Sequence, residues 1–223
     1  MTSTPVAFPS RDGLTLEAAL DEPLCARDEG GGAKAVLVFC HPHPKMGGTM
    51  NAPLLLAVRD ELVARGWAVI RFNFRGIGAS EGTPSEGIEE MQDAGGAIDF
   101  ARERFPGMPV AIAGWSFGAA VAVRVGCSES DVVACAAIAP PARRKPGVTE
   151  GLPPPAKWPR GRPLLVVTGE RDNVVAPADA RSWAREVRGA NYVEMKGANH
   201  FFWAQYEKLA KTVAGWLDEV LSR

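Results

Sequence analysis

The chain has 223 residues with a formal net charge of −1, of which 46% are hydrophobic and 23% are charged. This composition is typical of a globular protein with one sizeable core, and we expect a single domain over residues 1–223. The near-neutral charge gives no reason to expect a nucleic-acid partner, and no apolar run is long enough to predict a membrane span.

The start of the chain and its cysteines bear on the compartment. Residues 1–9 lack the charged start and the apolar core of a secretory signal peptide. The cysteines at positions 25, 40, 127 and 135 form no C-x-x-C motif, and Cys40 and Cys135 lie in apolar runs. Buried thiols suit a reducing compartment, so we predict a cytoplasmic protein. The sequence leaves open whether it is a monomer or a homodimer.

Short apolar runs and helical patterns alternate along the chain. Two runs, Val6–Phe8 and Leu14–Leu20, flank an Asp-Gly pair, which predicts an N-terminal β-hairpin. A charged, glycine-rich stretch at 26–34 is expected to be a surface loop. Further strands are predicted at 35–40, 68–74, 110–114, 132–139, 164–168 and 191–195, and helices at 53–65, 85–104, 177–188 and 203–222, with one more helix directly after Gly118. This alternation indicates an α/β fold with a mostly parallel, doubly wound sheet.

A serine lies at the sharpest of the predicted turns. The apolar run Val110–Gly114 leads into Trp-Ser-Phe-Gly, and an alanine- and valine-rich helical segment follows at once. Glycine at positions 114 and 118 removes the Cβ atoms that would crowd a tight strand-to-helix turn. Ser116 is at the tip of this turn, and its hydroxyl becomes a good nucleophile only when a base removes its proton.

Two further strand-to-helix loops supply a carboxylate and an imidazole. Ligands of doubly wound sheets bind beyond the carboxyl ends of the strands, where these loops lie. In the first loop we favour Asp172, because Glu170 is expected to point away and Asp179 falls inside a predicted helix. His200 follows the last predicted strand and a glycine turn. The three loops therefore bring Ser116, Asp172 and His200 to the same edge of the sheet.

The sequence resembles the α/β-hydrolase superfamily over nearly its whole length. The nucleophile elbow G-x-S-x-G occurs at 114–118, and the acid and the histidine follow in the order of that superfamily. Three more motifs resemble its small, lidless serine hydrolases: they are His-Pro-His-Pro at 41–44, R-F-N-F-R-G-x-G-x-S-x-G at 71–82 and His-Phe-Phe at 200–202. The resemblance implies an α/β-hydrolase fold without a lid domain, with Ser116, Asp172 and His200 as the catalytic triad.

Two other motifs receive structural interpretations. Ser80 also fits G-x-S-x-G, but it lies six residues beyond the predicted strand end at Phe74 and no apolar helix follows it. His41 and His43 have a spacing that could bind zinc, but no third ligand lies at a recognisable spacing. We expect a polar loop around Ser80, and a His41 that supports its own loop through hydrogen bonds.

An oxyanion formed at the nucleophile would need two backbone N–H donors. Phe117, the residue after the nucleophile, is expected to supply one. The loop after the strand 35–40 should supply the other, and its prolines have no N–H, which leaves His43 and Lys45, with 46–48 as further possibilities. The resemblance to the lidless hydrolases favours the backbone N–H of His43.

The predicted reaction is the hydrolysis of carboxylic esters through an acyl-enzyme intermediate. Ser116 would attack the carbonyl, His200 would move the proton, and Asp172 would hold the imidazole. The alternatives are a thioesterase or amide-type hydrolase with the same triad, and a non-catalytic binding protein on the hydrolase fold. The expected partner is a small-molecule ester, and no cofactor or metal is expected.

The segment 140–162 bears on the substrate. Many α/β hydrolases carry a helical lid here, and this proline-rich segment is too short for one, so we expect an open site for small or short-acyl esters. Besides the single acid Glu150 it holds six cations, at positions 143, 144, 145, 157, 160 and 162. This charge favours an anionic substrate, with an ordinary solvated loop as the alternative. Met46, Trp115 and Phe201 are candidate substrate contacts, and core packing is the alternative for the two aromatic residues.

Overall fold

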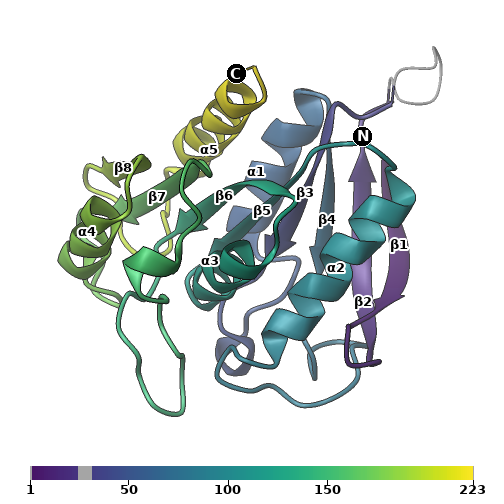
Figure 1. Ribbon diagram of the computed structural model, residues 1–223, viewed down its shortest axis with the longest axis horizontal. Coiled ribbons are helices and arrows are strands. Elements are labelled where there is room, and N and C mark those ends of the chain that lie inside the picture. The colour runs from purple at the N-terminus through teal and green to yellow at the C-terminus, as the bar shows by residue number, and fades with distance from the viewer. Residues whose placement is uncertain (1, 25–31, 223) are drawn as a thin grey trace.

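One eight-stranded sheet runs through the computed structural model, which describes residues 2–24 and 32–222 (Figure 1). The strands are β1 (Thr2–Pro9), β2 (Thr15–Glu22), β3 (Ala35–Cys40), β4 (Trp67–Phe72), β5 (Val110–Trp115), β6 (Val132–Ile138), β7 (Leu164–Gly169) and β8 (Ala190–Met195). Their order is β1-β2-β4-β3-β5-β6-β7-β8; β2 is antiparallel to β1 and β4, and every other neighbouring pair is parallel. The predicted mostly parallel sheet with an N-terminal hairpin is confirmed. The loop predicted at 26–34 lies mostly outside the described residues.

Helices cover both faces of this sheet (Figure 1). In the described residues they are α1 (Pro53–Ala64), α2 (Glu90–Arg104), α3 (Phe117–Ser128), α4 (Pro177–Glu186) and α5 (Tyr206–Leu221), with short 3₁₀ helices η2 (Pro44–Met46) and η3 (Pro155–Lys157). The α1 and α5 helices pack on one face, and α2, α3 and α4 pack on the other. None of these helices has the length and apolar character needed to cross a lipid bilayer.

Two helices begin later than the sequence predicts. The helix expected from position 85 begins at Glu90, because the buried Glu90 carboxylate accepts hydrogen bonds from the N–H groups of Ser85 and Gly87 and holds this segment in a turn. The helix expected from position 203 begins at Tyr206. Ala204 has a left-handed backbone with φ of 61°, which cannot be part of a right-handed helix.

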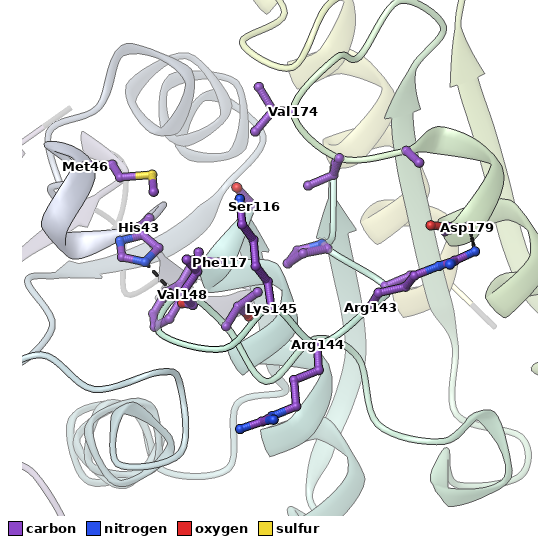
Figure 2. A pocket seen from close by; sticks show the side chains of 15 residues that line it. His43, Met46, Ser116, Phe117, Arg143, Arg144, Lys145, Val148, Val174 and Asp179 are labelled. Atoms are coloured by element: carbon purple, nitrogen blue, oxygen red, sulfur yellow. Dashed lines mark hydrogen bonds and ion pairs between the residues drawn. The ribbon is translucent and has the colours of Figure 1, made fainter.

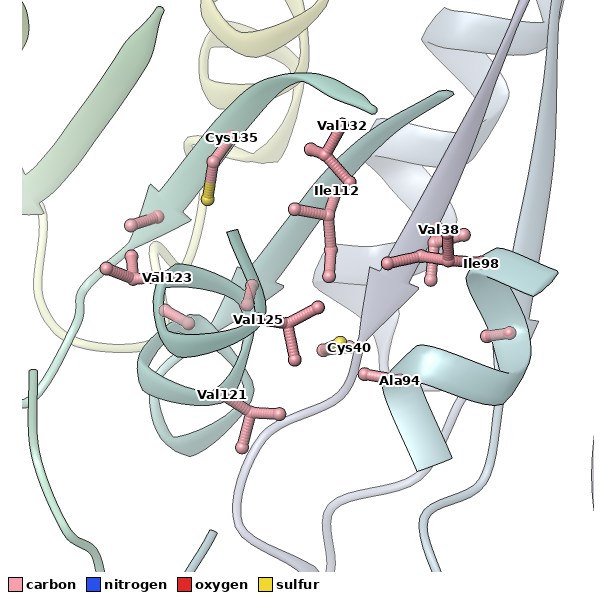
Figure 3. Packing of buried hydrophobic residues seen from close by; sticks show 14 of the residues in the cluster. Val38, Cys40, Ala94, Ile98, Ile112, Val121, Val123, Val125, Val132 and Cys135 are labelled. Atoms are coloured by element: carbon pink, nitrogen blue, oxygen red, sulfur yellow. The ribbon is translucent and has the colours of Figure 1, made fainter. Parts of the chain in front are cut away.

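The central strands are apolar on both faces because helices cover both faces. All residues of β3 and β5 are buried. On the face covered by α2 and α3, Val38 and Ile112 of the sheet belong to one cluster with Val121 and Val125 of α3 (Figure 3). These strands therefore read as continuous apolar runs rather than as alternating patterns.

The segment between β6 and β7 is short and irregular. Of its described residues, 155–157 form η3, and Lys145 and Thr149 form an isolated β-bridge. No lid domain is inserted at this place, as the sequence predicts.

Two buried arginines near the end of β4 pair with carboxylates, as expected from the sequence. Arg71 Nε lies 2.7 Å from Asp21 Oδ2, and Arg75 Nη2 lies 2.7 Å from Asp93 Oδ1. Arg71 also donates a hydrogen bond to the carbonyl oxygen of Met50 at 2.9 Å. This hydrogen bond ties Arg71 to the chain that leads from the His-Pro-His-Pro loop into α1.

Candidate active site

Ser116 lies between β5 and α3 in a backbone conformation that few residues adopt. Its φ is 55° and its ψ is −119°, whereas L-residues other than glycine rarely have positive φ. A Cβ on Gly114 would overlap the carbonyl oxygen of Gly118, and a Cβ on Gly118 would overlap that of His41. Only glycine fits at these two positions, and the close packing holds the Ser116 hydroxyl at the tip of the turn.

A chain of hydrogen bonds links Ser116 to His200 and Asp172. His200 Nε2 lies 3.0 Å from Ser116 Oγ, and His200 Nδ1 lies 2.7 Å from Asp172 Oδ2. The other carboxylate oxygen, Oδ1, accepts the N–H groups of Val174 and Val175, each at 2.9 Å. Because Asp172 accepts a proton donated by Nδ1, the neutral ring presents a lone pair at Nε2 toward the serine hydroxyl.

Backbone contacts bring the loops after β7 and β8 together. The N–H of Arg171 donates a hydrogen bond to the carbonyl oxygen of Ala198 at 2.8 Å. A Cβ on Gly169 would overlap this same oxygen, so glycine is required for the close approach. The two loops therefore run against each other, and Asp172 and His200 face one another across them.

The two rival acids lie elsewhere. Glu170 is exposed, and its carboxylate accepts the N–H of Gly197 at 2.7 Å. Asp179 lies in α4, and its carboxylate is 2.7 Å from a guanidinium nitrogen of Arg143. Of the three carboxylates considered from the sequence, the structure brings Asp172 to His200.

Val174 and Val175 are not among the residues predicted for the site. Their N–H groups fix the Asp172 carboxylate, and their side chains line a cavity beside Ser116. The Val174 side chain is exposed. An apolar pair that follows Asp172 and Asn173, in an otherwise polar loop, is the one signal in the sequence that could have pointed to them.

In the loop after β3, the N–H groups of residues 45–48 are engaged inside the loop. Their hydrogen bonds run from Lys45 to His43 Nδ1, from Met46 and Gly48 to the His43 carbonyl, and from Gly47 to the Pro44 carbonyl. Within residues 2–24 and 32–222, no acceptor lies within hydrogen-bond distance of the His43 N–H. Phe117 begins α3, so its N–H has no carbonyl partner inside the helix.

His41 supports this loop from below. Its ring is fully buried; Nδ1 lies 2.6 Å from the Pro42 carbonyl oxygen, and Nε2 accepts the N–H of Phe74 at 3.0 Å. Burial lowers the pKa of His41 from its ordinary 6.5 to about 4. Both ring nitrogens are engaged, which matches the predicted hydrogen-bonded support.

We expect the titration of His41 to make the fold less stable in mild acid. The unfolded chain binds a proton at this histidine below pH 6.5 whereas the folded chain does so only below about 4, so the free energy of unfolding should fall by about 3 kcal/mol between these values. Urea unfolding at pH 4.5, 5.5 and 7 measures this loss. The His41→Gln variant keeps an acceptor for Phe74 and does not titrate, so its loss should be smaller. Equal losses in both proteins would contradict the assignment.

Two cavities meet at Ser116. The first, here called the Lys145 cavity, has a volume of about 340 Å³ and lies against residues 141–149 and 174–179 (Figure 2). The second, here called the His200 cavity, has a volume of about 380 Å³ and lies against residues 42–53, Trp115, His200 and Phe201. His43, Met46, Ser116 and Val174 line both. Each has the size of a small-molecule site.

The candidate substrate contacts fall into two groups. Met46 is 68% exposed and lies where the two cavities meet. Phe201 is 38% exposed and lines the His200 cavity. Trp115 also touches that cavity, but it is only 7% exposed and its Nε1 donates a hydrogen bond to the His200 carbonyl at 3.2 Å. Trp115 therefore forms part of the cavity wall and also packs in the core, which was the alternative interpretation of this residue.

Ser80 is held in a structural role. Its Oγ donates a hydrogen bond to the Asn73 carbonyl at 2.7 Å and accepts the N–H of Glu17 at 2.9 Å. The residue is buried and is not among those lining either cavity. The polar-loop interpretation of this second G-x-S-x-G sequence therefore agrees with its contacts.

The cations of segment 140–162 are not all at the site. Arg143, Arg144 and Lys145 line the Lys145 cavity, whereas Lys157, Arg160 and Arg162 do not. Arg162, for example, donates a hydrogen bond to the Ser130 carbonyl at 2.7 Å. Three of the six cations that the sequence predicts beside the site are thus at the cavity.

Comparison with known proteins adds to this geometry. The profile of the serine aminopeptidase (S33) family matches residues 31–161. An uncharacterised protein of Rickettsia prowazekii is 29% identical over 211 residues, which are 88% of this chain and 86% of that protein. A serine hydrolase without a lid from Xanthomonas campestris is 26% identical with a TM-score of 0.82, covering 98% of this chain and 95% of that one. Est1E of Butyrivibrio proteoclasticus, solved with ferulic acid, has the same TM-score of 0.82 at 18% identity, covering 97% of this chain and 99% of that one. At this identity the similarity shows a shared fold.

Proposed function

Because the chain belongs to the serine aminopeptidase (S33) family of α/β hydrolases, we propose that it cleaves carboxylic esters of small or short-acyl substrates through an acyl-enzyme intermediate. The α/β-hydrolase fold predicted from the sequence is confirmed by its structural relatives. The observation that carries the proposal is the hydrogen-bonded chain from Ser116 through His200 to Asp172.

In the proposed reaction Ser116 is the nucleophile. Its Oγ attacks the ester carbonyl while Nε2 of His200 takes the hydroxyl proton, and the tetrahedral intermediate collapses when the imidazolium gives this proton to the leaving alkoxide. Water then attacks the acyl-serine with His200 as base again, and the acid and free Ser116 are released. Asp172 stabilises the imidazolium in both halves of the reaction.

The oxyanion of each tetrahedral intermediate requires preorganised donors. We assign this role to the backbone N–H groups of Phe117 and His43, since neither has an acceptor among the described residues. The neighbouring N–H groups of Lys45 to Gly48 are engaged inside the loop and are poor candidates. The hydrogen bonds of His41 beneath this loop would keep the His43 donor in place.

An ester fits the cavities better than the peptide implied by the family description. The substrate of an aminopeptidase carries a free α-ammonium group, which requires a carboxylate to bind it. Asp179 is the carboxylate that lines the Lys145 cavity, and it is paired with Arg143 at 2.7 Å, while Lys145 adds positive charge. We therefore favour an ester that brings no positive charge, and a thioester or an amide remains the alternative with the same three residues.

Chain length and covalent labelling test the proposal. We expect the protein to release p-nitrophenol from the acetate and butyrate esters and much more slowly from the octanoate, because a longer acyl chain would reach the charged end of the Lys145 cavity. We also expect a fluorophosphonate to label the protein at Ser116. Labelling without any ester turnover would favour thioesters or amides. Absence of both would contradict a serine hydrolase and favour a binding protein.

A further inference from the structure

The position of His200 separates the two halves of an ester substrate. In acyl transfer, the histidine gives its proton to the leaving group, so the leaving group must lie beside Nε2. His200 lines the His200 cavity and is not among the residues that line the Lys145 cavity. An alcohol leaving group therefore belongs in the His200 cavity. The acyl part, on the other side of Ser116, belongs in the Lys145 cavity.

Of the three cations that line the Lys145 cavity, two are paired with carboxylates. Arg143 lies 2.7 Å from Asp179, and Arg144 lies 2.9 Å from Glu150. Lys145 makes no ion pair and no side-chain hydrogen bond with the part of the chain that the structure describes. In Figure 2 its side chain extends from the loop in the direction of Ser116. One unpaired ammonium group thus faces the place of the acyl part.

Other groups around this ammonium leave its charge uncompensated. Apart from the paired Arg143, Arg144 and Asp179, the cavity wall carries His43, and burial lowers the pKa of its ring, so that it is neutral near pH 7. The remaining lining is mostly apolar and includes Val148, Val175 and Ala142. The cavity therefore offers an apolar wall for methylene groups and a single positive charge for an anion.

Lys145 is presented by an ordered turn. Its N–H donates to the Thr149 carbonyl at 2.8 Å, and its own carbonyl accepts the Thr149 N–H at 2.9 Å. The Val148 carbonyl between them lies 3.1 Å from His43 Nε2, which ties the turn to the loop after β3. Arg124 donates to the carbonyl of Gly151 at 2.9 Å and fixes the end of the turn. Less conformational entropy is lost when such a pre-organised loop binds an anion.

We propose that Lys145 selects esters whose acyl part ends in a carboxylate, so that the substrates are monoesters of short dicarboxylic acids. This inference rests on the proposed esterase function and names its substrate class. A carboxylate brings one negative charge, which can pair with the single unpaired positive charge of Lys145. It also accepts a charge-assisted hydrogen bond from the ammonium group. The alcohol part is left to the His200 cavity, with Phe201 on its wall.

Two esters of matched shape test this assignment. Monoethyl glutarate carries the carboxylate, and ethyl 5-methylhexanoate has an isopropyl group in its place. We expect the wild type to prefer the glutarate in kcat/KM, and Lys145→Met to lower kcat/KM for the glutarate by about tenfold while the neutral ester is unaffected. Lys145→Arg should retain the preference. Lys157→Met is the matched control, because Lys157 is an exposed cation of the same segment that does not line the cavity.

The outcomes separate this inference from the proposed function. If both esters are cleaved equally well by the wild type, or if Lys145→Met lowers both equally, the selection by Lys145 is wrong and the esterase stands. A similar loss in Lys157→Met would also overturn it, because the effect would then be a general effect of charge. If the wild type cleaves neither of these esters nor p-nitrophenyl butyrate and a fluorophosphonate fails to label it, the esterase itself is wrong.

Discussion

Replacement of Ser116 with alanine should lower kcat for p-nitrophenyl butyrate by about 10⁴- to 10⁶-fold and abolish labelling by a fluorophosphonate. The variant loses the oxygen that we propose forms the acyl-enzyme, whereas the proposed oxyanion donors and both cavities remain. Alanine also has no hydroxyl to activate, so a change of pH should not restore turnover. The measurement is initial rate of p-nitrophenol release, with mass spectrometry of the labelled protein.

Ser80→Ala is the control that the chain itself provides, since both serines lie in a G-x-S-x-G sequence. It leaves the Glu17 N–H without its acceptor and should cost about 1–3 kcal/mol of the free energy of unfolding. Its labelling and its kcat at 25 °C should remain those of the wild type. If Ser80→Ala loses the label and Ser116→Ala keeps it, Ser80 is the nucleophile and the choice made from sequence context is wrong.

The fold could be predicted from the sequence because its central strands are buried on both faces. An apolar run such as Ala35–Cys40 has few other interpretations when helical patterns alternate with it. The Asp-Gly pair before Leu14 likewise identified the hairpin of β1 and β2. Helix starts were less predictable. They depend on the side chain of Glu90 and on the backbone at Ala204, and neither leaves a periodic signal.

The candidate site was predictable to the extent that loop order determines position. Ser116, Asp172 and His200 follow parallel strands, whose carboxyl ends meet at one edge. The sequence alone left several N–H groups open as oxyanion donors, because it does not show which of them bond inside the loop after β3. It also could not show that, among the residues that the structure describes, Arg143 has a carboxylate partner and Lys145 has none. Such pairings depend on tertiary contacts between distant loops.

Replacement of Asp172, the proposed acid of the triad, is expected to have the second large effect on kcat. Asp172→Asn should lower kcat by about 10⁴-fold and leave KM for p-nitrophenyl butyrate nearly unchanged. The N–H groups of Val174 and Val175 both point at Oδ1, so the asparagine must place its oxygen there and its NH₂ group toward His200. That NH₂ group donates to Nδ1 and forces the ring proton onto Nε2, which can then no longer accept the proton of Ser116.

Asp179→Asn is the matched control for this substitution. Asp179 lines the Lys145 cavity but bonds to Arg143, so its replacement should leave kcat for the neutral ester as it is in the wild type. It should lower KM for monoethyl glutarate, because Arg143 is then released from its carboxylate and adds positive charge near the acyl part. The measurement is kcat and KM for p-nitrophenyl butyrate and for monoethyl glutarate between pH 6 and 9. If Asp179→Asn loses about 10⁴-fold in kcat while Asp172→Asn keeps its activity, then Asp179 supplies the acid, and the hydrogen bond that His200 donates to Asp172 serves only to hold two loops together.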